Sequence, residues 1–91
     1  MTMKIPVINL PKTGAKIDLL RKKANISVKD IQKIFGFESP QAIYKWIHGR
    51  NLPTVDNLII LAEIFNVTVD DILSIDYREI KEDKLNGNMA C

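Results

Sequence analysis

Four side chains that can form hydrogen bonds recur at helical spacing near the middle of the chain. They are Gln41, Tyr44, Lys45 and His48, and their spacing of i, i+3, i+4 and i+7 puts them on one face of a helix. None of them carries a negative charge. Such a face suits contact with a polyanion, and the alternative is an ordinary solvated helix face.

The distribution of charge favours the polyanion. Residues 1–50 hold ten Lys and Arg against three Asp and Glu, whereas residues 51–91 hold three against eight. The formal net charge of +2 over 91 residues hides this asymmetry. A basic half joined to an acidic half favours a polyanion such as nucleic acid as the partner of the first half, and the alternative is a solvated surface on which the charges happen to segregate.

The residue sets that other chemistries need are missing from the sequence. Cys91 and His48 are the only residues of their types, too few for a zinc cluster or a catalytic pair, and no glycine-rich phosphate loop is present. No apolar run approaches the roughly 18 residues of a membrane span, and the N-terminus lacks the apolar core of a signal peptide. We therefore expect no enzyme activity, catalytic residue, metal, cofactor, small-molecule ligand or membrane association, and a cytoplasmic location.

Cap residues and apolar spacing predict five short helices. The expected helix starts are Thr13, Ser27, Ser39, Thr54 and Thr68, and the expected stops include Asn25, Gly36, Gly49 and Asn66. The expected inward positions are Ile17, Leu20, Ala24, Ile31, Phe35, Ile43, Trp46, Ile47, Leu58, Leu61, Ala62, Phe65, Ile72 and Leu73. Because every connection is short, the prediction is an all-α, compact five-helix bundle over residues 13–75.

The two flanks are expected to lie outside this bundle. Pro6 and Pro11 argue against a helix in residues 1–12, so an extended N-terminal arm is expected there. Residues 76–91 form a charged C-terminal tail, expected to start with a short helical segment and to continue as disorder.

The arrangement of helix, three-residue turn and helix positions the polar face. The second helix is expected over Val28–Phe35, the turn over Gly36–Glu38 and the third helix over Pro40–His48. So short a turn forces the helices to cross steeply, and one of them then protrudes. Trp46 is in register with Ile43, which predicts core packing rather than a stacking platform for single strands.

Residues 17–73 resemble the Xre-type helix-turn-helix family, which includes phage Cro and repressor proteins and has the lambda-repressor-like fold. The resemblance is carried by Ile17-x-x-Leu20-Arg21, Ile26-Ser27-x-x-Asp30-Ile31, Phe35-Gly36-Phe37, Ile43-Tyr44-Lys45-Trp46, Gly49, Pro53, Leu58-x-x-Leu61-Ala62 and Phe65-Asn66-Val67-x-x-Asp70-x-Ile72-Leu73. It implies a transcriptional regulator, usually a homodimer, that binds double-stranded DNA through its third helix.

The family's contacts map onto specific residues of this chain. The resemblance implies base-edge contacts from Pro40, Gln41, Ala42 and Lys45, of which Gln41 suits an adenine and Lys45 a guanine or a phosphate. It implies phosphate contacts from Ser27, Val28, Lys29, Tyr44, His48, Arg50 and Asn51.

Four positions depart from the family pattern. Val28 replaces a common glutamine, Gln32 a small residue, and Ile47 a glutamate that pairs with Arg21, while Glu38 lengthens the turn. We therefore expect Arg21 to pair with Glu38 or to reach solvent. These departures leave open a protein-interaction module on the same fold, antitoxin-like or regulator-binding, with weak or no DNA binding.

The leading prediction is a sequence-specific regulator, such as a repressor, that binds a pseudo-palindromic DNA site as a dimer. Two surfaces are candidates for the dimer contact. One lies on the fourth and fifth helices and the residues after them, with Ile59, Ile60, Val67, Val69 and Ile75. The other is the arm around Ile5–Leu10, whose apolar residues could pair across the two-fold axis.

Overall fold

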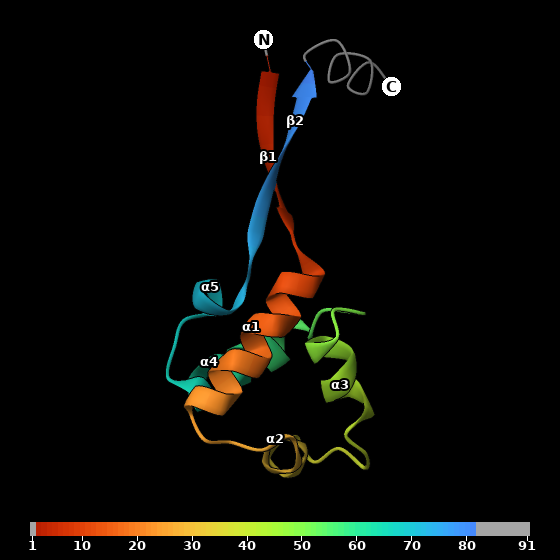
Figure 1. Ribbon diagram of the computed structural model, residues 1–91, viewed down its shortest axis with the longest axis vertical. Coiled ribbons are helices and arrows are strands. Elements are labelled where there is room, and N and C mark those ends of the chain that lie inside the picture. Colours follow the sequence, from red (N-terminus) through yellow and green to blue (C-terminus); the bar gives the residue numbers. More distant parts are fainter. Residues whose placement is uncertain (1, 82–91) are drawn as a thin grey trace.

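A computed structural model describes residues 2–81 of the chain as a helical bundle from which a two-stranded ribbon projects (Figure 1). The elements are, in order, β1 (Thr2–Ile8), α1 (Leu10–Lys23), α2 (Val28–Phe35), α3 (Gln41–Ile47), α4 (Val55–Phe65), α5 (Val69–Ile72) and β2 (Ile75–Lys81). No helix among these residues is long and apolar enough to cross a membrane.

All five helices contribute to one core. Its buried apolar residues are Ile17, Ile31, Ile43, Trp46, Leu58, Leu61, Ala62, Phe65 and Ile72. The inward positions predicted from the helical spacing are therefore confirmed at these residues. Leu20, Phe35, Ile47 and Leu73 are half-buried at the edge of the core, and the expectation for Ala24 is wrong, because this residue at the C-terminal cap of α1 is exposed.

The helix caps explain where most of the helices begin and end. Ser27 and Asp30 form a reciprocal capping box at the start of α2, and Thr68 and Asp71 form one at the start of α5. Asn25 takes a left-handed φ of 58° after α1, as its residue type predicts. These local signals are strong enough to be read without tertiary information.

The start of α1 differs from the prediction. The helix begins at Leu10, and Asn9 caps it by accepting a hydrogen bond from the backbone N–H of Lys12 at 2.9 Å. Pro11 fits because the first turn of a helix does not use its N–H groups. Thr13, the expected cap, is buried instead, and its Oγ1 accepts a hydrogen bond from the N–H of Ser74 at 2.9 Å.

The expectation of an all-α fold is wrong. Strands β1 and β2 form an antiparallel sheet with a register running from Thr2 opposite Lys81 to Ile8 opposite Ile75. The extended arm supplies a backbone edge, and residues 76–81 pair with it as a strand rather than forming the expected helical segment. Lys4 lies opposite Glu79, a favourable cross-strand pair. The expected disorder at the C-terminus falls on residues 82–91, outside the described part.

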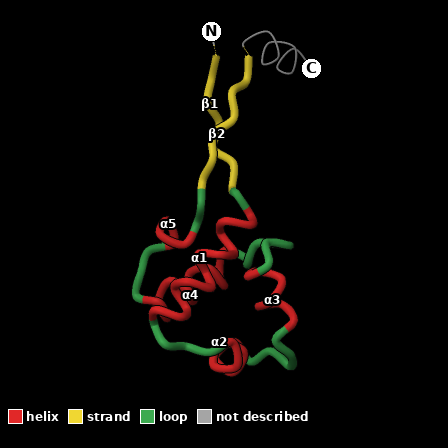
Figure 2. The backbone as a smooth tube through the Cα atoms, viewed as in Figure 1, coloured by secondary structure: helices red, strands yellow, loops and turns green. Residues whose placement is uncertain are grey.

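The ribbon is fixed to the bundle at its base. The backbone N–H of Asn9 donates to the carbonyl of Ser74 at 2.8 Å, and its side-chain amide donates to Asp76 at 2.8 Å. The backbone N–H of Ser74 also donates a hydrogen bond to Oγ1 of Thr13, as described above. The described chain is elongated, measuring 49 × 24 × 19 Å, and the ribbon and α2 lie at opposite ends (Figure 2).

Candidate nucleic-acid interface

The turn between α2 and α3 is held by Gln32. Gly36 ends α2 with a left-handed φ of 70°, a conformation that favours glycine. The side-chain amide of Gln32 then donates to the carbonyl of Phe37 at 3.2 Å, and the N–H of Phe37 donates to the carbonyl of Gln32 at 3.1 Å. The length of Gln32 thus allows it to span the turn.

Three aromatic rings set the orientation of α3. Phe35 and Phe37 stack with ring centroids 5.2 Å apart, and Trp46 meets them edge-on at 5.7 and 6.0 Å. Trp46 is only 5% exposed, so the predicted core role is confirmed. Because Trp46 and Ile43 are buried on one side of α3, the opposite side of that helix faces outward.

Gly14 lets α1 approach the end of α3 closely. A Cβ atom on this residue would lie 2.3 Å from the carbonyl oxygen of Trp46 and 2.5 Å from that of Ile47. Sequence reasoning missed this contact, because a glycine inside a helix does not reveal which distant backbone it approaches.

The four polar residues singled out by their spacing are all exposed on α3 or at its end. The rings of Tyr44 and His48 stack with centroids 6.0 Å apart. Gln41 and Lys45 lie on the rim of a hollow beside the start of α3, which also includes Phe37, Glu38, Ser39, Ala42 and Asn51. Three of the residues predicted to contact base edges, Gln41, Ala42 and Lys45, are thus neighbours on one surface.

A second hollow joins α3 to the first turn of α2. Its lining residues are Val28, Lys29, Gln32, Pro40 and Tyr44. Predicted phosphate residues from α2 therefore lie beside predicted contact residues from α3. Ser27, His48 and Arg50 line neither hollow, although all three are exposed.

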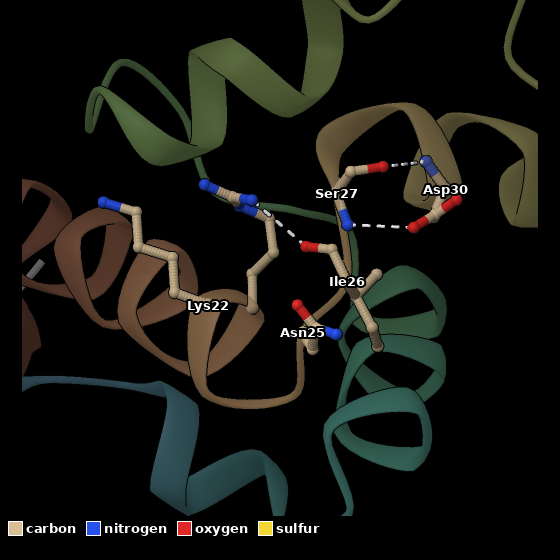
Figure 3. A pocket seen from close by; sticks show the side chains of 6 residues that line it. Lys22, Asn25, Ile26, Ser27 and Asp30 are labelled. Carbon is tan, nitrogen blue, oxygen red and sulfur yellow. Dashed lines mark hydrogen bonds between the residues drawn. The ribbon is translucent and has the colours of Figure 1, made fainter.

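The capping box determines which backbone donors of α2 remain for an outside partner. Ser27 Oγ accepts from the N–H of Asp30 and the Asp30 carboxylate accepts from the N–H of Ser27, both at 3.0 Å (Figure 3). This leaves the first-turn N–H groups of Val28 and Lys29, which no helical carbonyl can reach. The hydrogen bond from the Ser27 backbone also holds the pKa of Asp30 below its ordinary value of 3.8.

Arg21 pairs within its own helix, contrary to both expectations. Its guanidinium donates to Asp18 Oδ1 at 2.7 and 3.1 Å and to the carbonyl of Ile26 at 3.1 Å. Partial burial raises the pKa of Asp18, but hydrogen bonds from Arg21 and Lys22 outweigh it and leave that pKa lowered. The i, i+3 spacing of Asp18 and Arg21 was a readable signal for this pair.

Residues 2–81 hold no cluster of three or more His, Cys, Asp or Glu side chains suited to a metal ion. The surface around α3 instead offers hydrogen-bond donors and cations, namely Lys29, Lys45 and Arg50, beside exposed helix N–H groups. This arrangement is suited to binding an anion.

Comparisons with known proteins identify the same segment. A family model described as helix-turn-helix matches residues 17–72. The chain is also similar to a crystal structure of the DNA-binding domain of BldD, with 24% identity and a TM-score of 0.60 over 71% of this chain and 93% of that one. A structure of the S. venezulae BldD DNA-binding domain matches equally well, with 96% of that chain covered. These two likenesses show the shared fold. No curated protein matches the chain.

Proposed function

The chain belongs to the Cro/C1-type helix-turn-helix family, and we propose that it regulates transcription by binding a specific double-stranded DNA sequence as a two-fold dimer. Its family is one of DNA-binding regulators that are typically not enzymes. A DNA-binding regulator has to be in the compartment that holds the DNA, and we propose that this compartment is the cytoplasm.

The observation that carries this proposal is the outward face of α3. Its donors project from a helix whose other side is anchored by Ile43 and Trp46, beside the free N–H groups of α2. An α-helix fits the major groove of B-DNA, where base edges present a distinct pattern of donors and acceptors. In this pose α3 enters the groove and α2 lies across the phosphate backbone.

The base contacts would come from the start of α3. We assign Gln41 to an adenine, whose N6 and N7 match the glutamine amide, and Lys45 to guanine O6 and N7 or to a phosphate. Pro40 and Ala42 are half-buried and offer only apolar contact, for example to a thymine methyl group.

The phosphate contacts would surround this face. We assign them to the hydroxyl of Ser27, to the N–H groups of Val28 and Lys29, and to the side chains of Lys29, Tyr44, His48, Arg50 and Asn51. Such contacts fix the position of the protein on the duplex, while the base contacts select the sequence.

Salt dependence of duplex binding tests whether the surface neutralises phosphates. With about three cations at phosphates, log K should fall against log salt concentration with a slope of about −3 per chain. Lys45→Glu should weaken binding at least about tenfold, whereas Lys12→Glu, the same charge change on α1, should leave it within about twofold. Salt-independent or undetectable binding by folded protein would instead favour the protein-interaction module.

A further inference from the structure

The hollow at the start of α3 contains one acidic side chain. Glu38, in the turn before α3, is exposed and lines this hollow together with Gln41 and Lys45. The ion pairs within residues 2–81 lie on α1, and none of them involves Glu38. A carboxylate without an ion-pair partner in the described chain therefore lies beside two residues assigned to base edges.

The contacts around the turn give this carboxylate no structural role. The backbone N–H of Gln41 donates to Oγ of Ser39 at 3.5 Å, so the side chain bonded to the start of α3 is Ser39 rather than Glu38. The turn itself is held by the hydrogen bonds between Gln32 and Phe37. The Glu38 carboxylate can therefore accept hydrogen bonds from a ligand without breaking a contact of the fold.

A carboxylate at this position opposes binding to the phosphate backbone. Phosphates attract the nearby cations Lys45 and Arg50 but repel Glu38, because like charges raise the energy of the complex. A hydrogen-bond donor on the DNA can offset this repulsion, and the donors in the major groove are the amino groups of cytosine and adenine. Glu38 is therefore better suited to a base edge than to a phosphate.

We propose that Glu38 is a specificity-determining residue, whose carboxylate accepts a hydrogen bond from N4 of a cytosine next to the base contacted by Gln41. The inference rests on the proposed function, because it requires α3 in the major groove. Cytosine is preferred over adenine because adenine presents the acceptor N7 beside its N6 amino group, and this acceptor repels a carboxylate. Gln41 carries both a donor and an acceptor, so it matches adenine where Glu38 does not.

Glu38 and Lys45 then have complementary roles in one hollow. The ammonium group of Lys45 only donates hydrogen bonds, which suits guanine O6 and N7, and the ionised carboxylate of Glu38 only accepts them, which suits cytosine N4. We therefore expect each half-site to contain a cytosine that depends on Glu38.

Selection from random duplexes at about 150 mM salt, with the wild type and Glu38→Ala, tests the assignment. The wild type should prefer cytosine at one position of each half-site, and Glu38→Ala should lose at least about fivefold of that preference. The variant should also bind a duplex without the motif at least about twofold more tightly, because a like charge has been removed. Glu63→Ala on α4, an exposed residue that lines neither hollow, is the matched control and should change neither property.

N4-methylcytosine at the preferred position probes the hydrogen bond itself. Its methyl group replaces the amino hydrogen that faces the major groove, while pairing with guanine is kept. The wild type should bind this duplex at least about fivefold more weakly than the unmodified one, whereas Glu38→Ala should bind both about equally. Far-ultraviolet circular dichroism and emission from buried Trp46 should be unchanged in both variants, which shows that they are folded.

Three results would overturn the assignment of Glu38 while the proposed function stands. They are a selected motif whose base preferences Glu38→Ala leaves unchanged, a preference for adenine rather than cytosine at the position that depends on Glu38, and an equal loss on N4-methylation in the wild type and Glu38→Ala. Folded wild type that selects no motif would instead remove the proposed function, and this inference with it.

Discussion

Gln41 provides the sharpest prediction at the scale of single residues. Gln41→Ala should weaken binding to the selected DNA by about 1–3 kcal/mol and relax the preference at one position of each half-site. The free energy of unfolding should change by less than about 0.5 kcal/mol, because Gln41 is exposed. Titrations against the selected site and its single-base variants measure both effects.

Gln32 supplies the matched control for that substitution. Gln32→Ala removes the hydrogen bond to the carbonyl of Phe37 and should cost about 1 kcal/mol of stability. It should leave the order of preferred bases unchanged, because Gln32 supports the turn rather than the base contacts. Relaxed base preference in Gln32→Ala but not in Gln41→Ala would reverse the two assignments.

For Gly14→Ala, the structure predicts a change in stability opposite in sign to the change that helix propensity predicts. Glycine to alanine inside a helix usually stabilises by about 0.5–1 kcal/mol. Gly14→Ala should instead destabilise by at least about 2 kcal/mol, because the added Cβ would collide with the backbone of Trp46 and Ile47. Urea unfolding measures the change, with Leu19→Ala on the exposed side of α1 as a near-neutral control. A stabilised Gly14→Ala protein would refute the close approach of α1 and α3.

The capping carboxylates predict a loss of stability in acid. Backbone hydrogen bonds from Ser27 and Thr68 lower the pKa of Asp30 and Asp71 from their ordinary value of 3.8. Their contribution is therefore fully present above that ordinary value and is lost as the pH falls through the lowered pKa. Asp30→Asn with Asp71→Asn should flatten this part of the curve of unfolding free energy against pH. If the unfolding free energy of the double variant falls in acid as much as that of the wild type, the two capping boxes do not contribute to the acid dependence of stability.

At the scale of elements, the helices were predictable and the second strand was not. The boxes at Ser27 and Thr68 and the left-handed residues Asn25 and Gly36 act within a few residues of sequence. Strand β2 depends on pairing with β1 across the whole domain, as Ile75 opposite Ile8 shows. A short charged segment carries little strand signal without its partner, so the C-terminal segment was wrongly predicted to begin as a helix.

Thr13 gives the test of how this ribbon is joined to the bundle. Thr13→Val should cost about 1–3 kcal/mol of stability, because it leaves the part-buried N–H of Ser74 without the Oγ1 acceptor. Thr13→Ser keeps that oxygen and should cost less than Thr13→Val. Equal costs in thermal or urea unfolding would mean that the hydrogen bond contributes nothing beyond the packing of the side chain.

Some features of the candidate site also follow from the local sequence, whereas others depend on contacts between distant segments. The outward face of α3 follows from helical periodicity, so Gln41 and Lys45 could be picked out from spacing alone. The close contact between Gly14 of α1 and the backbone of α3 involves segments that are distant in the sequence, and no local sequence pattern predicts it. The partner of Arg21 is also local, because Asp18 lies only three residues away on the same helix, whereas the family pattern places the partner of this arginine at position 47.

At the scale of the whole molecule, the ribbon and the α2–α3 surface occupy different ends of an elongated chain. A two-fold dimer predicts two half-sites with centres about one helical turn, roughly 34 Å, apart along the duplex. This symmetry is a property of the assembly, and the sequence of a single chain does not display it.

Selection from a pool of random duplexes at about 150 mM salt tests sequence-specific binding most directly, because weak non-specific complexes dissociate at that ionic strength. We predict enrichment of a two-fold symmetric motif with half-sites about one helical turn apart. Loss of preference at one position per half-site in Gln41→Ala would connect the motif to α3. Folded protein that enriches no motif would contradict sequence-specific DNA binding by this chain.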